Sequence, residues 1–108
     1  MSVSDEDIAH ALELFEGLGT LTTRKMMGGL CLYCDGTIFS ILHGDGSIWL
    51  KGKDAFAEEL TALGWERWSY SRDGGKPTFM PYWRLPAEAL DEPELACRWA
   101  RRALAVLT

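Results

Sequence analysis

The sequence predicts an α+β protein in which helices cover mainly one face of a five-stranded antiparallel sheet. Three segments, near the start, the middle and the end of the chain, carry apolar residues at helical spacing. Between them, runs of aromatic and aliphatic residues alternate with Gly- and Asp-rich turns, which is typical of consecutive hairpins. The 108 residues suffice for one hydrophobic core, so we expect a single domain over residues 1–108.

The first helix is expected from about Asp5 to Glu16. Ser4 precedes it, and Asp7 follows three residues later in a variant of the capping box. Apolar residues then recur at helical spacing until Gly17. The acidic first turn suits the positive end of the helix dipole, so these charges need no ligand to explain them.

Three consecutive antiparallel strands are expected next, near Thr23 to Cys34, Thr37 to His43 and Ser47 to Lys51. The turns between them are Asp35-Gly36 and Gly44 to Gly46, both of which have the composition of tight hairpin connections. Gly28-Gly29 interrupts the long first strand and predicts a bend or a bulge there, with at least one glycine in a conformation that a side chain would penalise.

The second half of the chain begins with a helix that Asp54 opens and Gly64 ends. Two further strands flank the turn Arg72 to Gly75. The last of them, Thr78 to Trp83, contains Pro81, which has no N–H for a strand ladder. We therefore expect this strand at an edge or a bulge of the sheet rather than at its centre.

A third helix closes the chain. Asp91 and Glu94 repeat the capping-box spacing, and Pro93 falls in the first turn, where its missing N–H does no harm. The expected order is α-β-β-β-α-β-β-α. Because no strand-helix-strand alternation occurs, an antiparallel sheet is favoured over a parallel one.

The net charge of −5 is unevenly distributed. The first twenty residues contain five acidic and no basic side chains, whereas residues 21–85 contain eight basic and seven acidic ones. Non-specific binding of nucleic acids depends on phosphate neutralisation by a basic face. The charge balance therefore argues against strong DNA binding by this chain.

The sequence also predicts the compartment. No stretch approaches the roughly 20 apolar residues of a membrane span, and the acidic N-terminal segment does not resemble a secretory signal. We therefore expect a cytoplasmic protein with no membrane association. Three cysteines, an odd number, fit reduced thiols in that compartment better than a disulfide framework.

Cys31 and Cys34 have the spacing of half a zinc site or of a redox pair. Structural zinc needs four ligands, and only Cys97 and His43 remain as distant candidates. If both cysteines lie in one strand, their three-residue offset points the side chains to opposite faces. We therefore expect no metal and no cofactor.

No other motif predicts catalysis. Gly28-Gly29 lacks the surrounding residues of a nucleotide-binding loop, and Gly44 to Gly46 lacks the carboxylate spacing of a calcium loop. His10 and His43 have no neighbouring nucleophile and are expected at the surface. The sequence therefore indicates no catalytic residues and no enzyme.

The order and spacing of a set of residues give the chain a resemblance to a known family. The opening residues are Arg24-Lys25-Met26-Met27-Gly28-Gly29, then Leu32-Tyr33, Asp35-Gly36 and Phe39; the later ones are Trp49-Leu50-Lys51, Gly64, Tyr70, Gly75-Lys76, Met80, Tyr82-Trp83, Pro86, Leu90, Pro93, Leu95 and Trp99-Ala100. Together they resemble the N-terminal domain of the TfoX (Sxy) competence regulators over nearly the whole chain. The departures are Met27, where the family often has Phe, Cys31, where it often has Gly, and the absence of the family's C-terminal domain.

The resemblance implies an α+β fold similar to secretion chaperones, a role near the regulation of competence for DNA uptake, and no established enzyme activity. We expect a regulatory module that contacts a protein partner, with a homodimer as one form of that contact. The candidate interaction surface consists of Arg24, Lys25, Tyr70, Phe79, Tyr82 and Trp83.

Two alternatives remain open. One is direct nucleic-acid binding through Arg24, Lys25, Lys51 and Lys53 with the nearby aromatic residues. The other is a ligand sensor or small enzyme with a cleft beside Tyr82-Trp83.

Overall fold

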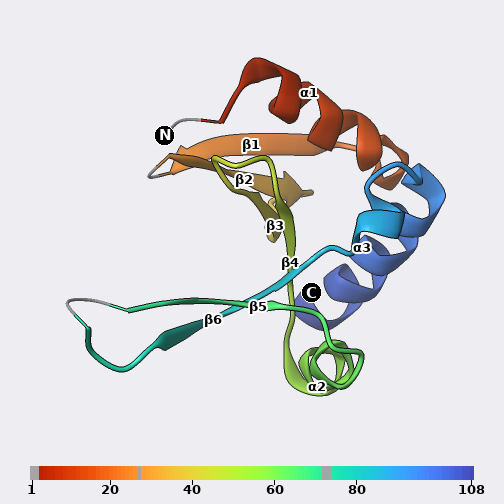
Figure 1. Ribbon diagram of the computed structural model, residues 1–108. Helices are drawn as coiled ribbons and strands as arrows, with labels where there is room; N and C mark the ends of the chain where they lie inside the picture. The colour runs from red at the N-terminus through yellow and green to blue at the C-terminus, as the bar shows by residue number, and fades with distance from the viewer. Residues whose placement is uncertain (1–2, 27, 72–73) are drawn as a thin grey trace.

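The computed structural model describes residues 3–26, 28–71 and 74–108. Its core element is a six-stranded antiparallel sheet in the order β1-β2-β3-β4-β6-β5. Among the described residues, three α-helices and two short 3₁₀-helices, η1 and η2, accompany the sheet, and Figure 1 shows how the α-helices lie beside it. The α+β class and the antiparallel sheet are confirmed, whereas the expected number of five strands is wrong. Within the described residues, no helix combines the length and apolar character needed to cross a membrane.

Helix α1 spans Asp5–Leu14, and its start follows from the predicted cap. The Asp7 N–H donates a hydrogen bond of 3.1 Å to the hydroxyl of Ser4, which satisfies one of the free amides of the first turn. The helix ends before the predicted Glu16, because the chain continues as η1 (Glu16–Leu18).

The extra strand arises where one long strand was expected. Residues 23–34 contribute to two strands, β1 (Leu21–Met26) and β2 (Gly29–Cys34), which pair antiparallel. Gly28 adopts a φ of +84°, so the chain reverses there instead of bending within one strand. The apolar pattern of two short strands joined by a tight turn looks like that of one strand with a bend, and this explains the missing strand.

The next two connections follow the predicted turns. Between β2 and β3 (Thr37–Leu42), Asp35 and Gly36 adopt φ values of +49° and +83°, as a type I′ hairpin turn requires. Between β3 and β4 (Ile48–Lys51), the carboxylate of Asp45 accepts hydrogen bonds from the backbone N–H and the hydroxyl of Ser47.

Helix α2 spans Asp54–Ala62, and the predicted glycine, Gly64, follows its C-cap residue. Gly64 has a φ of +83°, and its N–H donates to the carbonyl of Thr61 at 3.1 Å. The Trp65 N–H donates to the carbonyl of Leu60 at 3.1 Å. Both bonds together form a Schellman cap, which releases the chain toward β5.

The last two strands, β5 (Arg67–Tyr70) and β6 (Thr78–Arg84), form a hairpin. β6 lies between β4 and β5, so it is not an edge strand, and of the two expected positions for Pro81 only the irregularity remains. Pro81 falls where the register between β5 and β6 shifts, and this irregularity accommodates its missing N–H. The predicted turn at Arg72 to Gly75 lies partly outside the described residues.

Part of this hairpin extends beyond the rest of the sheet. β4 pairs with β6 only from Lys51 opposite Tyr82 to Trp49 opposite Arg84. The segment Thr78–Pro81 therefore has β5 as its sole strand partner among the described residues. We call this segment and β5 the arm; Figure 1 shows it projecting to the left, away from the helices.

Helix α3 spans Pro93–Leu107, and Pro93 occupies the first helical position as predicted. The expected cap by Asp91 is wrong, since Glu92 is the N-cap residue and makes no side-chain cap bond. The 3₁₀-helix η2 (Ala87–Ala89) precedes it, and the Glu92 N–H donates to the carbonyl of Ala89 at 3.3 Å. The residue before α3 is therefore held by a backbone hydrogen bond, and no side-chain cap bond is present there.

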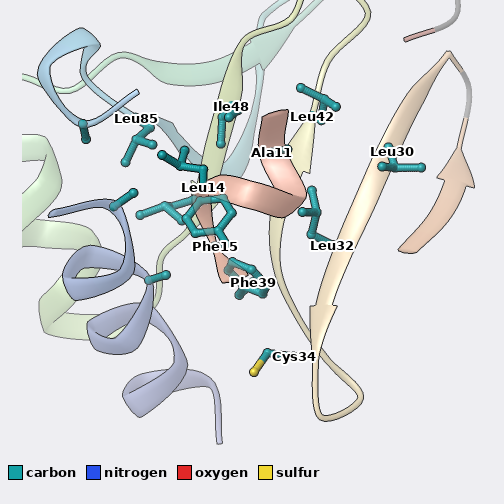
Figure 2. Close-up of a cluster of buried hydrophobic side chains, with 14 residues drawn as sticks. Ala11, Leu14, Phe15, Leu30, Leu32, Cys34, Phe39, Leu42, Ile48 and Leu85 are labelled. Carbon is teal, nitrogen blue, oxygen red and sulfur yellow. The ribbon is translucent and has the colours of Figure 1, made fainter. Parts of the chain in front are cut away.

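The main core lies between the sheet and the helices, on what we call the helix face (Figure 2). Phe15 and Phe39 meet edge to face with ring centroids 5.1 Å apart. A smaller cluster joins α2, α3 and β6 on the same face, where Phe56, Leu60 and Trp83 are buried together. All three α-helices thus contribute to burial on the helix face, as the sequence predicts.

Replacing Gly29 with alanine should destabilise the fold. A Cβ atom there would lie 2.9 Å from the backbone oxygen of Leu42 in the neighbouring strand, which cannot yield like a side chain. We expect a loss of about 1–3 kcal/mol in the free energy of unfolding, measured by denaturant titration. Gly17→Ala is the matched control, because its Cβ would lie 3.4 Å from the Cys97 Sγ and meets no backbone atom within 4 Å. Equal stability of both variants would contradict this account of Gly29.

Candidate interaction surface

The sheet face opposite the helices carries a second apolar cluster, and we call this face the open face. Its residues alternate along the strands with those of the main core, as pleating requires. No helical residue belongs to the cluster within the described parts of the chain. Its buried members are Cys31, Ile41, Trp49 and Tyr82, with Tyr33, Ile38, Trp68 and Met80 packed partly buried against them.

Trp68 on β5 covers part of the open face by reaching across the sheet. Two strands, β4 and β6, separate β5 from β3, which corresponds to about 14 Å at the usual strand spacing. The rings of Trp68 and His43 nevertheless have centroids only 4.7 Å apart. The sheet is therefore curled toward its open face, and its own side chains shield the second cluster from water.

His43 follows β3 and lies inside this aromatic cluster. Its ring stacks on Trp49 with centroids 4.9 Å apart, and its Nε2 atom is buried without a hydrogen-bond partner. Burial lowers the pKa of His43 below its usual range; Arg84 adds to this effect, and Asp45 opposes it. The expectation of a surface histidine is wrong, because the curl of the sheet brings Trp68 over the ring.

A short chain of hydrogen bonds holds the β3–β4 turn beside this histidine. The indole N–H of Trp49 donates to the hydroxyl of Ser47 at 2.8 Å, and that hydroxyl donates to the carboxylate of Asp45 at 2.6 Å. These bonds from Ser47 lower the pKa of Asp45. The carboxylate is therefore engaged in holding the turn, and the Ser47 hydroxyl is engaged with it.

Cys31 and Cys34 lie in different clusters, as their spacing predicts. Cys31 packs on the open face, with its Sγ 3.8 Å from the Sδ of Met26, whereas Cys34 belongs to the main core. Burial raises the pKa of both thiols, which keeps them protonated and weakly nucleophilic. Among the described residues, no three His, Cys, Asp or Glu side chains gather in a way that fits a metal ion.

The four aromatic residues of the predicted surface are divided between burial and exposure. Tyr82 is buried on the open face, where burial raises its pKa to about 12. Trp83 is only 2% exposed on the helix face, and its indole N–H donates to the hydroxyl of Thr61 at 3.2 Å. Tyr70 and Phe79 lie on the arm and are 44% and 58% exposed.

The two cationic residues of the predicted surface lie at the other end of the sheet. Arg24 and Lys25 are on the edge strand β1, and the structure does not bring them to the arm. They also point to opposite faces, since Arg24 is paired with Cys31 and Lys25 with Leu30. The six predicted residues therefore do not form one continuous surface.

Arg67 was not singled out from the sequence, although it shapes the arm. Its guanidinium lies 4.6 Å from the ring centroid of Trp83 and 5.6 Å from that of Phe79, and its Nε donates to the carbonyl of Met80 at 2.9 Å. The alternation of apolar and polar residues in β5 gives no hint of these contacts, because they depend on the register with β6.

A groove of about 500 Å³ runs between α2 and β6, beside Trp83 and Arg67. Its charged lining residues are Lys53, Asp54, Glu58 and Arg67. No serine, cysteine or histidine is among the described residues that line it. The groove corresponds to the cleft that the sequence suggested for a ligand, and Trp83 is one of the residues that line it.

Comparison with known families agrees with this architecture. The sequence profile of the TfoX N-terminal domain matches residues 13–107, which include every strand of the sheet together with α2 and α3. The chain belongs to the TfoX N-terminal domain family. A search of curated proteins finds no match. Membership confirms the resemblance drawn from residues 24–100.

In this member of the family, we predict that the thiols have no structural metal. The double variant Cys31→Ser, Cys34→Ser should lose no more than about 1–3 kcal/mol in the free energy of unfolding, the range of ordinary point substitutions. Treatment of the unaltered protein with a chelator should leave its melting temperature unchanged. Stoichiometric zinc in the purified protein, with unfolding on its removal, would contradict the prediction.

We also predict a specific pH dependence from His43. Because the folded state holds the pKa below the ordinary 6.5, the unfolded chain binds the proton first as the pH falls. The contribution of neutral His43 to stability is therefore complete above about pH 6.5 and decreases from there down to the lowered pKa of the folded state. Denaturant titrations at about pH 7.5 and about pH 5.5 should show a larger loss for the unaltered protein than for His43→Phe. Identical losses would refute a titrating His43.

Proposed function

We propose that this protein is a non-enzymatic regulatory module that acts through protein contacts, in the regulation of competence for DNA uptake or of transcription. Membership of the TfoX N-terminal domain family supports the regulatory role. The observation that carries the contact mechanism is the exposure of Tyr70 and Phe79 on the projecting arm.

The arm has features that a partner would explain. Trp68 and Met80 pack the base of the arm onto the open-face cluster, whereas its outer part extends beyond β4. A two-stranded hairpin without further packing is only marginally stable in water. Tyr70 is paired with Thr78, and Phe79 with Ser69, so the two exposed rings lie on opposite faces of the arm. A partner that covers the arm would bury apolar surface on either face.

Nucleic-acid binding receives less support from the arrangement of the cations. Arg24 and Lys25 lie on β1, whereas Lys51 lies on β4, which β2 and β3 separate from β1 in the sheet. Binding of a phosphate backbone draws its affinity from cations gathered along one face. The separation of these residues therefore favours contact with a protein.

The test is affinity capture at native expression level, with arm variants. Phe79→Ser should lose at least tenfold of any specifically captured partner, because the ring is exposed and its truncation removes contact area. Leu63→Ser is the control, since Leu63 is 54% exposed at the end of α2 and lies outside the arm. Circular dichroism should show that both variants remain folded.

Two results would count against the proposal. One is capture of the same partner at the same level by Phe79→Ser and by the unaltered protein. The other is an unchanged level of DNA-uptake transcripts in host cells that lack this protein, which would remove the regulatory role in competence.

A further inference from the structure

The two edges of the sheet differ in how they are protected against pairing with another strand. β1 exposes five of its six residues, and two adjacent ones, Arg24 and Lys25, are cationic. Charged side chains, especially lysine, are a common device against edge-to-edge association. β5 has one charged residue, Arg67, at its start, followed by Trp68, Ser69 and Tyr70. Its outer edge has no strand partner among the described residues.

We propose that the outer edge of β5 pairs antiparallel with β5 of a second copy of this chain, around a twofold axis at Ser69. This inference rests on the proposed function in one respect, because both assign a contact to the arm. It names the occupant of the β5 edge and the register of the contact. The two sheets would then join into one.

Symmetry restricts the register. A twofold axis between antiparallel strands is perpendicular to the sheet, so directly opposed residues must point to the same face in both copies. A register meets this requirement only if one residue lies directly opposite the same residue of the other copy. In any other register, a residue would face the next residue along the partner strand, which points to the other face of the sheet. Near the centre of β5, the two choices are an axis at Trp68 or an axis at Ser69.

The axis at Ser69 gives the better cross-strand pairs. It sets Trp68 opposite Tyr70 of the partner subunit on the open face. The twofold axis produces this pair two times, so each exposed Tyr70 ring gains one aromatic neighbour. The axis at Trp68 would instead set the Tyr70 ring opposite the exposed carboxylate of Glu66 of the partner subunit.

Charge is also compatible with the Ser69 register. Arg67 would face the uncharged Ser71 of the partner subunit, and the small Ser69 side chains would meet at the axis without crowding. Self-pairing of β1 would bring two copies of Arg24 and Lys25 together, with no acidic residue in that strand to offset them. A second copy therefore fits β5 and not β1.

The size of the contact sets its strength. A standard interface buries about 800 Å² per partner, which is more than two four-residue strands provide. We therefore expect a dimer that dissociates on dilution rather than an obligate one.

Disulfide crosslinking tests the register directly. In Ser69→Cys, the two introduced thiols would lie on directly opposed residues, within the Cα separation that a disulfide spans. Mild oxidation should therefore give a covalent dimer. Ser71→Cys is the control, because its two copies would be about 13 Å apart along the strands and should not react. The three native cysteines are buried, which keeps background crosslinking low.

Charge substitutions at the same position provide a second measurement. Ser69→Lys and Ser69→Asp each place like charges at the axis, so each alone should be monomeric at concentrations where the unaltered protein is dimeric. An equimolar mixture should recover the dimer. Light scattering across a dilution series reports the mass in each case.

Some outcomes would overturn the dimer. These are a monomeric mass of the unaltered protein at every concentration, equal crosslinking of Ser69→Cys and Ser71→Cys, or no recovery in the mixture. If the unaltered protein is monomeric but still captures a partner that Phe79→Ser loses, the dimer is rejected and the proposed function stands. If it is dimeric and captures nothing, the proposed function fails and the dimer stands.

Discussion

The structure depends on one constraint, the alternation of side chains across a single sheet. Successive residues of each strand point to opposite faces, and the three helices bury only one of them. The other face carries Cys31, Ile41, Trp49 and Tyr82, which are too apolar to remain in water. The sheet solves this by curling, so that Trp68 from the last strand in the order contacts His43, just after β3, and Tyr82 on β6. A second core is thus built without a second layer of helices.

The curl of the sheet determines which side chains are buried and which are exposed to a partner. It buries Tyr82 and half-buries His43, and it leaves the far part of the β5–β6 hairpin outside both cores. Polar groups near the second core are largely engaged in holding the β3–β4 turn, as the bonds from Ser47 to Asp45 show. Together with the family, these features are the basis of the proposed contact mechanism.

Features that depend on neighbouring residues could be predicted from the sequence. The Ser4 cap, the Asp35-Gly36 turn and the Gly64 helix end each need only a few adjacent residues, and all three are confirmed. The strand count failed at Gly28, because a hairpin and a bent strand have the same alternation on either side of the turn. The candidate surface could be predicted only in part. The alternation of side chains along β6 places Tyr82 and Trp83 on opposite faces, and this could be predicted. Their burial could not, because Tyr82 is covered by the curl of the sheet and Trp83 by α2, and both involve residues distant in sequence.

The contact between Trp68 and His43 has a thermodynamic consequence. These residues are 25 positions apart in the chain, and two strands, β4 and β6, separate β5 from β3, yet their rings pack together. A displacement of β5 that separates the two rings would uncover the His43 ring. Binding at the arm and the packing of His43 would then be linked equilibria. A partner that holds β5 in its present position would also stabilise this ring contact, and by reciprocity the contact would strengthen binding at the arm.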